Sequence, residues 1–264
     1  MNIIEERAEK NPWFEIGVSS ILGTRSYQQD FAYFYTGSQE VLAIVCDGMG
    51  GLQGGERASQ TAVQLMAQDF KREKPISNIP AFLHQEAGRM DKAVAALKND
   101  QGKPLEGGTT LVAVYCNKNQ MYWVSVGDSR IYLIRGGKIS SENREHNYRL
   151  MLKEQLAAGK ISREFYEKEE KTPQAEALIS FLGMNGLKVV DVKKTPTLLH
   201  KGDMIMLCSD GVYKSLNESQ VCAMALDNDL DMYIAADRTT AMALRYGQRG
   251  QDNTTVILMK YLGE

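Results

Sequence analysis

The sequence predicts an α+β fold in which antiparallel sheets stack on one another and are covered by helices. Apolar, β-like runs arrive in hairpin groups, and stretches with helical periodicity arrive in pairs. The pattern lacks the strict strand-helix alternation that a doubly wound parallel sheet requires. No internal repeat, low-complexity tract or linker interrupts the 264 residues, so we expect a single domain over residues 1–264.

The first third of the chain is expected to hold three strands followed by two helices. Residues 13–20, 31–36 and 41–46 are rich in Val, Ile, Phe and Tyr and are separated by polar residues and glycines, which predicts strands. Apolar side chains at helical spacing predict a helix from Glu56 to about Glu73. A second helix is expected from Pro80 to Lys98, because proline is tolerated in the first helical turn.

Three more strands are expected to form a meander in the middle of the chain. They cover residues 110–116, 121–126 and 131–134. A short polar turn at residues 117–119 joins the first two, and Gly136-Gly137 is a two-residue hairpin signal that leads into residues 138–140.

The last part of the chain begins with a charged segment and returns to strands and helices. Residues 145–183 are rich in Lys and Glu, with helical stretches and a Thr172-Pro173 breaker, so we expect a peripheral insertion. The remaining expected elements are strands at 187–192, 204–208 and 254–260, and helices at 217–226 and 230–246.

Composition and charge exclude several classes of protein. The 31 Lys and Arg residues nearly balance the 33 Asp and Glu residues, and no basic block suggests a nucleic-acid-binding surface. The apolar runs are too short to cross a bilayer, so no membrane association is expected. Residues 1–7 lack the basic-then-apolar order of a secretory signal, which indicates a cytoplasmic protein.

Cysteines and histidines point away from a transition-metal site. The four cysteines form no Cys-x-x-Cys pair, and we interpret them as buried, reduced thiols. The three histidines, His84, His146 and His200, lie far apart in the sequence, which makes a His-rich metal centre improbable.

Aspartates recur at the ends of predicted strands. The five residues placed in this way are Asp30, Asp47, Asp128, Asp210 and Asp252. A single Asp-Gly or Asp-Asn pair is most simply a turn. Five such placements favour a functional site over five separate turns, because strand ends of a sheet sandwich can converge on one rim. Oxygen ligands without histidine suit hard ions such as Mg²⁺ or Mn²⁺.

A glycine-rich segment lies between the third strand and the first helix. Residues 48–55 contain five glycines, so the backbone can turn sharply there and offer a carbonyl oxygen to a metal. A phosphate cradle at the helix start is the competing interpretation. We rank it second, because neither the Walker sequence nor the dinucleotide fingerprint is present.

Six short motifs follow one another in a fixed order along the chain. They are Gly23-Thr-Arg25-Ser-Tyr-Gln-Gln-Asp30, Asp47-Gly-Met-Gly-Gly51, Gly108-Thr-Thr110, Gly127-Asp-Ser-Arg130, Ser209-Asp-Gly211 and Asp252-Asn253. Over about residues 15–260 the chain therefore resembles the metal-dependent serine/threonine protein phosphatases of type 2C, the PPM family, in its bacterial-type form. This resemblance implies a four-layer αββα sandwich, with two central antiparallel sheets, a dinuclear metal site at one end and a flap insertion around residues 145–183.

The resemblance also implies metal-binding roles. Asp47 resembles the carboxylate that bridges both metals, and Gly48 the residue that lends its backbone carbonyl. Asp210 and Asp252 resemble the ligands that complete the first metal. Asp30 resembles the acid that holds the second metal through metal-bound water.

Three further residues receive roles in the same way. Arg25 falls where the family places its phosphate-clamping arginine, although a surface ion pair is the simpler alternative. Asp128 resembles the residue that helps to hold a third, weaker metal in bacterial-type members, or it merely caps the turn. We expect Arg130 to brace loops and not to contact substrate.

Several residues depart from the family pattern. Gln29 replaces a common Glu and loses a charge, which favours weaker binding of the second metal. Met49 stands where animal members have a histidine that acts as a general acid. Glu145-His146-Asn147 resembles the start of the flap, whereas Ala175-Glu176 replaces the Arg-Asn usual at its exit.

The function implied is hydrolysis of phosphoserine and phosphothreonine in proteins, opposing a bacterial serine/threonine kinase. Two Mn²⁺ or Mg²⁺ ions, with a possible third, would share a hydroxide that attacks phosphorus directly, without a phosphoenzyme. Arg25 and Asp47 are the candidate catalytic residues, and a monomer is expected. A noncatalytic regulator of the same fold and a hydrolase of small phosphoesters are the alternatives.

Overall fold

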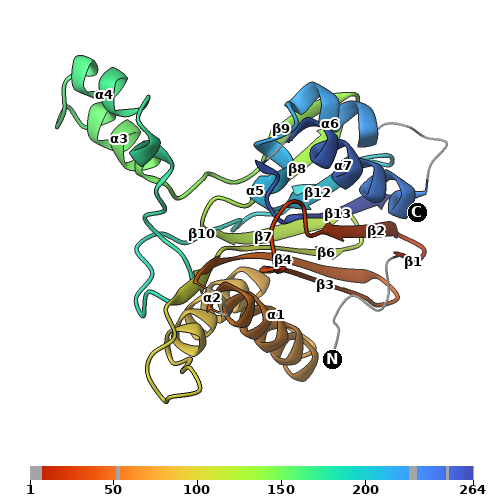
Figure 1. The fold of residues 1–264 in the computed structure, drawn as a ribbon. Coiled ribbons are helices and arrows are strands. Elements are labelled where there is room, and N and C mark those ends of the chain that lie inside the picture. The colour runs from red at the N-terminus through yellow and green to blue at the C-terminus, as the bar shows by residue number, and fades with distance from the viewer. Residues whose placement is uncertain (1–7, 52–53, 226–230, 248–249, 264) are drawn as a thin grey trace.

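Two antiparallel sheets pack face to face at the centre of the protein, and helices cover both outer faces (Figure 1). The computed structural model describes residues 8–51, 54–225, 231–247 and 250–263. This arrangement confirms the expected α+β sandwich of four layers.

The first sheet has six strands. Its members are β1 (Ala8–Lys10), β2 (Phe14–Ile21), β8 (Arg130–Arg135), β9 (Lys138–Ser141), β12 (Met204–Cys208) and β13 (Thr254–Tyr261). They lie in the order β1-β2-β13-β12-β8-β9, and every neighbouring pair is antiparallel.

The second sheet has seven strands. Its members are β3 (Asp30–Thr36), β4 (Glu40–Gly50), β5 (Gly107–Thr109), β6 (Leu111–Asn117), β7 (Gln120–Val126), β10 (Asp191–Val192) and β11 (Thr197–Leu198). The main order is β10-β7-β6-β4-β3, with β11 also on β7 and β5 on the end of β4.

Helices form the outer layers. The described helices are α1 (Gly54–Arg72), α2 (Ile79–Ala95), α3 (Tyr148–Ala157), α4 (Arg163–Glu169), α5 (Asp210–Tyr213), α6 (Glu218–Ala225) and α7 (Met232–Tyr246), with a 3₁₀ turn at Pro173–Glu176. Helices α1 and α2 cover the seven-stranded sheet, and α5, α6 and α7 cover the six-stranded sheet (Figure 1). No helix in the described part of the chain is both long and apolar enough to cross a membrane.

Strand β4 shows why the central runs are apolar without interruption. Val41, Ala43 and Val45 point into the layer between the sheets, whereas Leu42 and Ile44 pack against α1 and α2. Because successive side chains of a strand point to opposite faces, a strand with helices on one side and a sheet on the other must be apolar on both.

The expected meander is wrong. Strands β6 and β7 pair in the seven-stranded sheet, but β8 lies in the other sheet, between β12 and β9. The chain changes sheets at Gly127, whose φ of 97° is in the left-handed region that favours glycine. Apolar periodicity identifies a strand but not its neighbour, so the crossover could not be read from the pattern.

Two other boundaries differ from expectation. Helix α2 ends at Ala95 and not at Lys98, because Lys98 forms an isolated bridge with Pro104. Of the strand expected at 187–192, only β10 forms, because the backbone of Val189 is bonded to the Ser180 hydroxyl. Residues 1–7 and the expected helix ends at 226 and 230 lie outside the described residues.

The insertion expected at residues 145–183 projects from the sandwich as a helical pair, α3 and α4 (Figure 1). The side chains of Asn147 and Ser162 cap the two helices by accepting hydrogen bonds from backbone N–H groups. Arg149 of α3 reaches back to Glu176 at 2.6 Å and ties the helix to the returning chain.

Candidate metal centre

Five aspartates gather at one end of the sandwich, as expected from the sequence, although Asp47 lies inside β4 and not after it. Asp30 and Asp47 face each other in the β3–β4 ladder of the seven-stranded sheet. Asp210 follows β12 and Asp252 precedes β13, which are neighbours in the six-stranded sheet. Asp128 lies where the chain crosses between the sheets, directly after Gly127.

Asp47 is held by its backbone and is surrounded by negative charge. Its N–H donates to the Thr110 hydroxyl at 2.9 Å, and its carbonyl accepts from the Thr109 hydroxyl at 2.9 Å. Burial raises the pKa of its carboxyl group well above the ordinary value, and the charges of the other four aspartates raise it further. Each of the other four aspartates is therefore close enough to Asp47 for its charge to act on the Asp47 carboxyl group.

Asp30 is a buried carboxyl group with one unsatisfied oxygen. Its side chain is 2% exposed, Oδ2 accepts a hydrogen bond from the Ser209 hydroxyl at 2.7 Å, and Oδ1 has no partner. Burial raises the pKa of Asp30 to about 7, against the hydrogen bonds from Ser209 and Thr255. Such an orphaned buried oxygen costs free energy unless a ligand satisfies it.

Asp210 and Asp128 form the opposite side of the cluster. Asp210 Oδ1 is buried without a partner, and its Oδ2 is ion-paired with Lys214 one helical turn later. Burial raises the pKa of Asp128 to about 6, and the charge of Asp210 adds to this shift while that of Lys214 opposes it.

Arg25 lies beside Asp252 at the mouth of the cluster. Its Nη2 atom is 2.6 Å from Asp252 Oδ2, and more than half of the Arg25 side chain remains exposed. The hydrogen bond and charge of Asp252 raise the pKa of the guanidinium, with smaller contributions from Asp210 and Asp47. Arg25 thus forms the surface ion pair that the sequence offered as the simpler alternative, and its exposed part stays free of that contact.

Gly48 lies where three backbone segments meet. A Cβ atom at this position would be 2.2 Å from the Gly55 carbonyl oxygen and 2.5 Å from that of Gln29. The Gln29 side chain donates to the Gly50 carbonyl oxygen at 3.1 Å, so it braces the glycine-rich segment. Only glycine permits this close approach of strand, loop and helix start.

The donor set fits hard divalent cations. All five side chains offer carboxylate oxygens, and two of them, Asp30 and Asp210, carry buried oxygens with no partner. In the described residues, no three Asp, Glu, His or Cys side chains are already placed as a complete ligand set. One carboxylate oxygen of Asp210 is paired with Lys214, and one of Asp252 is paired with Arg25.

Sequence reasoning missed the residues that support the site. Thr109 and Thr110 appeared only as part of a motif, and Ser209 only as the residue before an aspartate. Lys214 received no role, although its spacing of four residues from Asp210 would place it on the same face of a helical turn.

The structure agrees with a bracing role for Arg130. Its guanidinium lies 3.6 Å from the centre of the Tyr213 ring and donates to the Tyr132 hydroxyl at 2.7 Å and to Glu145. Ala175 is buried and Glu176 is paired with Arg149, so these two residues stabilise the flap from within.

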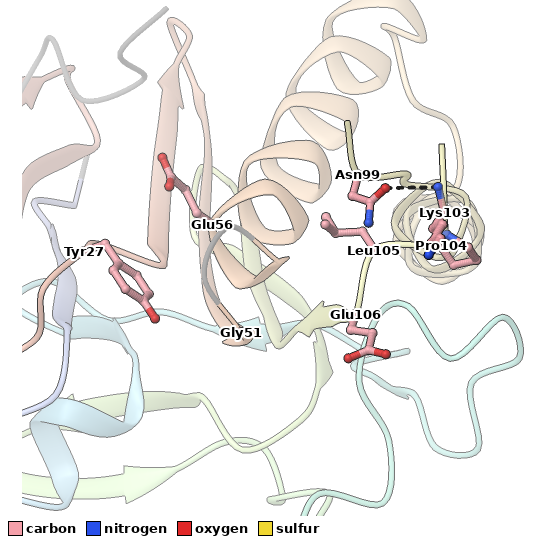
Figure 2. Close-up of a pocket in the computed structure, with 8 residues that line it drawn as sticks. All are labelled: Tyr27, Gly51, Glu56, Asn99, Lys103, Pro104, Leu105 and Glu106. Atoms are coloured by element: carbon pink, nitrogen blue, oxygen red, sulfur yellow. Dashed lines mark hydrogen bonds between the residues drawn. The ribbon is translucent and has the colours of Figure 1, made fainter. Parts of the chain in front are cut away.

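A cavity of about 940 Å³ opens beside the glycine-rich segment (Figure 2). Figure 2 shows Tyr27 and Gly51 on one side and the segment from Asn99 to Glu106 on the other. None of the five aspartates lines it. This cavity is therefore distinct from the carboxylate cluster.

Comparisons with known proteins agree with this geometry. The family described as "Protein phosphatase 2C" matches residues 19–243. A serine/threonine phosphatase, stp, from Listeria welshimeri is 31% identical over 231 residues, which cover 86% of this chain and 87% of that protein.

Solved structures are similar over almost the whole chain. A serine/threonine phosphatase from S. agalactiae has a TM-score of 0.80 at 25% identity and covers 95% of this chain and 100% of its own. The catalytic domain of the phosphatase PstP, in complex with two manganese ions, has a TM-score of 0.72 at 24% identity and covers 95% and 99%. Together with the matched family pattern over most of the sequence, the ordered motifs and the carboxylate cluster, these findings show that the chain belongs to the protein phosphatase 2C family, which is metal-dependent.

Proposed function

We propose that this protein hydrolyses phosphoserine and phosphothreonine in proteins, with two Mn²⁺ or Mg²⁺ ions at the aspartate cluster. One observation carries the proposal: five aspartates lie together, two with orphaned buried oxygens, beside a half-exposed arginine. A fold alone would tolerate neither the repulsion nor the unsatisfied oxygens without some compensating gain.

Each residue has a part in holding the ions. Asp47 would serve both ions and Gly48 would lend its backbone carbonyl, with Asp210 and Asp252 completing the first site and Asp30 supporting the second through water. Bound divalent cations supply a water of lowered pKa and stabilise negative charge on the phosphoryl group.

Arg25 positions the phosphate ester. Its guanidinium is already oriented by Asp252, and its exposed edge can bind two phosphate oxygens in a bidentate fork. Met49 has no proton to give, so the departing serine or threonine oxygen takes its proton from water. No cysteine is available as a nucleophile within the described residues, since all four are buried and burial raises the pKa of each thiol.

The choice of a protein substrate rests on the relatives. Those at 30% identity or more are named serine/threonine phosphatases, and they support a phosphoprotein substrate made by a bacterial serine/threonine kinase. We also propose that the protein is cytoplasmic and monomeric and that residues 1–264 form a single domain. Analytical ultracentrifugation tests the monomer, and a single cooperative unfolding transition tests the single domain.

The test of the activity measures phosphate release from a phosphothreonine peptide. Turnover is expected with Mn²⁺ and should disappear with excess chelator and in Asp210→Asn, while Glu167→Gln, an exposed control on α4, keeps it. Arg25→Lys should lower kcat/KM by about 10- to 100-fold, because a lysine cannot make the bidentate contact. Turnover that survives the chelator refutes the mechanism, and faster hydrolysis of nucleotides or sugar phosphates favours the small-phosphoester alternative.

A further inference from the structure

A lysine ammonium is paired with one of the five aspartates of the cluster. Lys214 Nζ is ion-paired with Asp210 Oδ2, the side chain of which is only 13% exposed. The Lys214 N–H donates to the Asp210 carbonyl at 3.0 Å, so the short helix α5 fixes the two residues one turn apart. The helical backbone therefore places the Lys214 ammonium beside the Asp210 carboxylate.

The same helical turn is attached to Asp128. The hydroxyl of Tyr213, the residue before Lys214, donates to the Asp128 carbonyl at 3.1 Å. The Arg130 guanidinium packs on the Tyr213 ring and holds it in place. These contacts attach the helical turn that carries Lys214 to the backbone of Asp128, and the charges of Lys214 and Asp210 both act on the Asp128 carboxyl group.

Other cations near the cluster are paired with other carboxylates. Arg25 is paired with Asp252 at the mouth, and Arg130 is paired with Glu145. In the part of the chain that the structure describes, Lys214 is the one cation paired with Asp210.

We propose that the Lys214 ammonium, paired with Asp210, takes the place of the third, weaker ion expected beside Asp128, so that the protein binds two divalent ions and its own lysine replaces a third. This inference rests on the proposed function. A lysine ammonium is a compact point charge with three N–H donors, which suits it to bridge two carboxylates.

Charge balance explains what the lysine achieves. The five aspartates carry a formal charge of −5, two divalent ions add +4, and Arg25 adds +1, which gives zero. Lys214 raises the sum to +1, so the site attracts a phosphate dianion without a third metal.

The experiment counts ions directly. Manganese bound per chain is measured by equilibrium dialysis and by the Mn²⁺ electron paramagnetic resonance signal, for the full chain and for variants. We expect two ions for the wild type and for Lys214→Arg, three for Lys214→Gln, and two again for Lys214→Gln combined with Asp128→Asn. Circular dichroism confirms that each variant is folded, and the half-exposed position of Lys214 favours this.

The outcomes separate the two proposals. A wild type that binds three ions, or a Lys214→Gln variant that still binds two, overturns the role of the lysine while the phosphatase proposal stands. A wild type that binds no manganese and shows no metal-dependent turnover overturns both. A third ion in Lys214→Gln that persists after Asp128→Asn also contradicts the inference, because the new ion would then lie elsewhere.

Discussion

Replacing Asp30 with asparagine should stabilise the metal-free protein at alkaline pH. Asp30 is 2% exposed, and burial raises its pKa from 3.8 to about 7. Asparagine keeps an oxygen for the Ser209 hydroxyl and removes the buried charge.

The magnitude follows from the pKa. A difference between 3.8 and about 7 corresponds to about 4 kcal/mol at pH 8, at about 1.4 kcal/mol per pKa unit, and to less than about 2 kcal/mol at pH 5. These are upper limits, because water and side chains relax around an ionised group. We therefore expect Asp30→Asn to gain about 1 to 3 kcal/mol at pH 8.

The sign can be checked from the direction of the shift. Because the folded-state pKa of Asp30 is raised, its favourable contribution is complete below about pH 4 and is lost as the pH rises through 7. The wild type should therefore lose stability over this window, and Asp30→Asn should lose less.

The assay is urea unfolding in excess chelator at pH 5 and pH 8, followed by circular dichroism. The matched control is Asp91→Asn, another buried aspartate, whose carboxylate accepts backbone N–H groups from Gly183, Asn185 and Gly186 at 2.7 to 3.2 Å. This control should lose about 2 kcal/mol, because the asparagine NH₂ group cannot accept these bonds. If Asp30→Asn is less stable than the wild type at pH 8, the electrostatic account of the cluster is wrong.

Two further changes test neighbouring parts of the structure. Gly48→Ala should lower the free energy of unfolding by about 3 kcal/mol and abolish Mn²⁺ binding, because its Cβ atom would meet the Gly55 and Gln29 carbonyl oxygens. Calorimetric titration with Mn²⁺ checks the second effect, and an unchanged affinity for Mn²⁺ would contradict the prediction. Burial, with a smaller contribution from Asp69, raises the pKa of Glu86 to about 7, so the stability linked to its protonated form is lost as the pH rises from about 4.5 through 7. Urea unfolding of Glu86→Gln should therefore show about 1 to 2 kcal/mol less loss of unfolding free energy over this pH range than the wild type shows. If the pH dependence of stability is the same in both proteins, the assignment to Glu86 is wrong.

Local chemistry made much of the fold predictable. The run at residues 41–46 became the centre of β4, and Gly136-Gly137 became a hairpin with φ of 55° and 77°. Pairing between strands was not predictable in the same way, since β8 is equally apolar on both faces and could have joined either sheet. Strands of two or three residues, such as β5 and β11, have too few residues to show a period.

In the candidate site, too, residues marked by a local sequence pattern were predictable, and residues defined by tertiary contacts were not. Asp47 and Asp210 were identifiable because each comes soon after a continuous apolar run, residues 41–46 or 204–208, and precedes a glycine. The supporting contacts of Thr110 and Lys214 depend on which strand or turn lies opposite them, and this is a property of tertiary structure.

The cluster is assembled from both sheets, with Asp30 and Asp47 from one and Asp210 and Asp252 from the other. The distance between these two half-sites is therefore set by the apolar layer between the sheets, in which Val45 and Leu207 are completely buried. A substitution in that layer that changes the sheet spacing would alter the separation of the candidate metal ligands without contacting any of them. The thickness of the hydrophobic core thus determines the distance between the two pairs of aspartates.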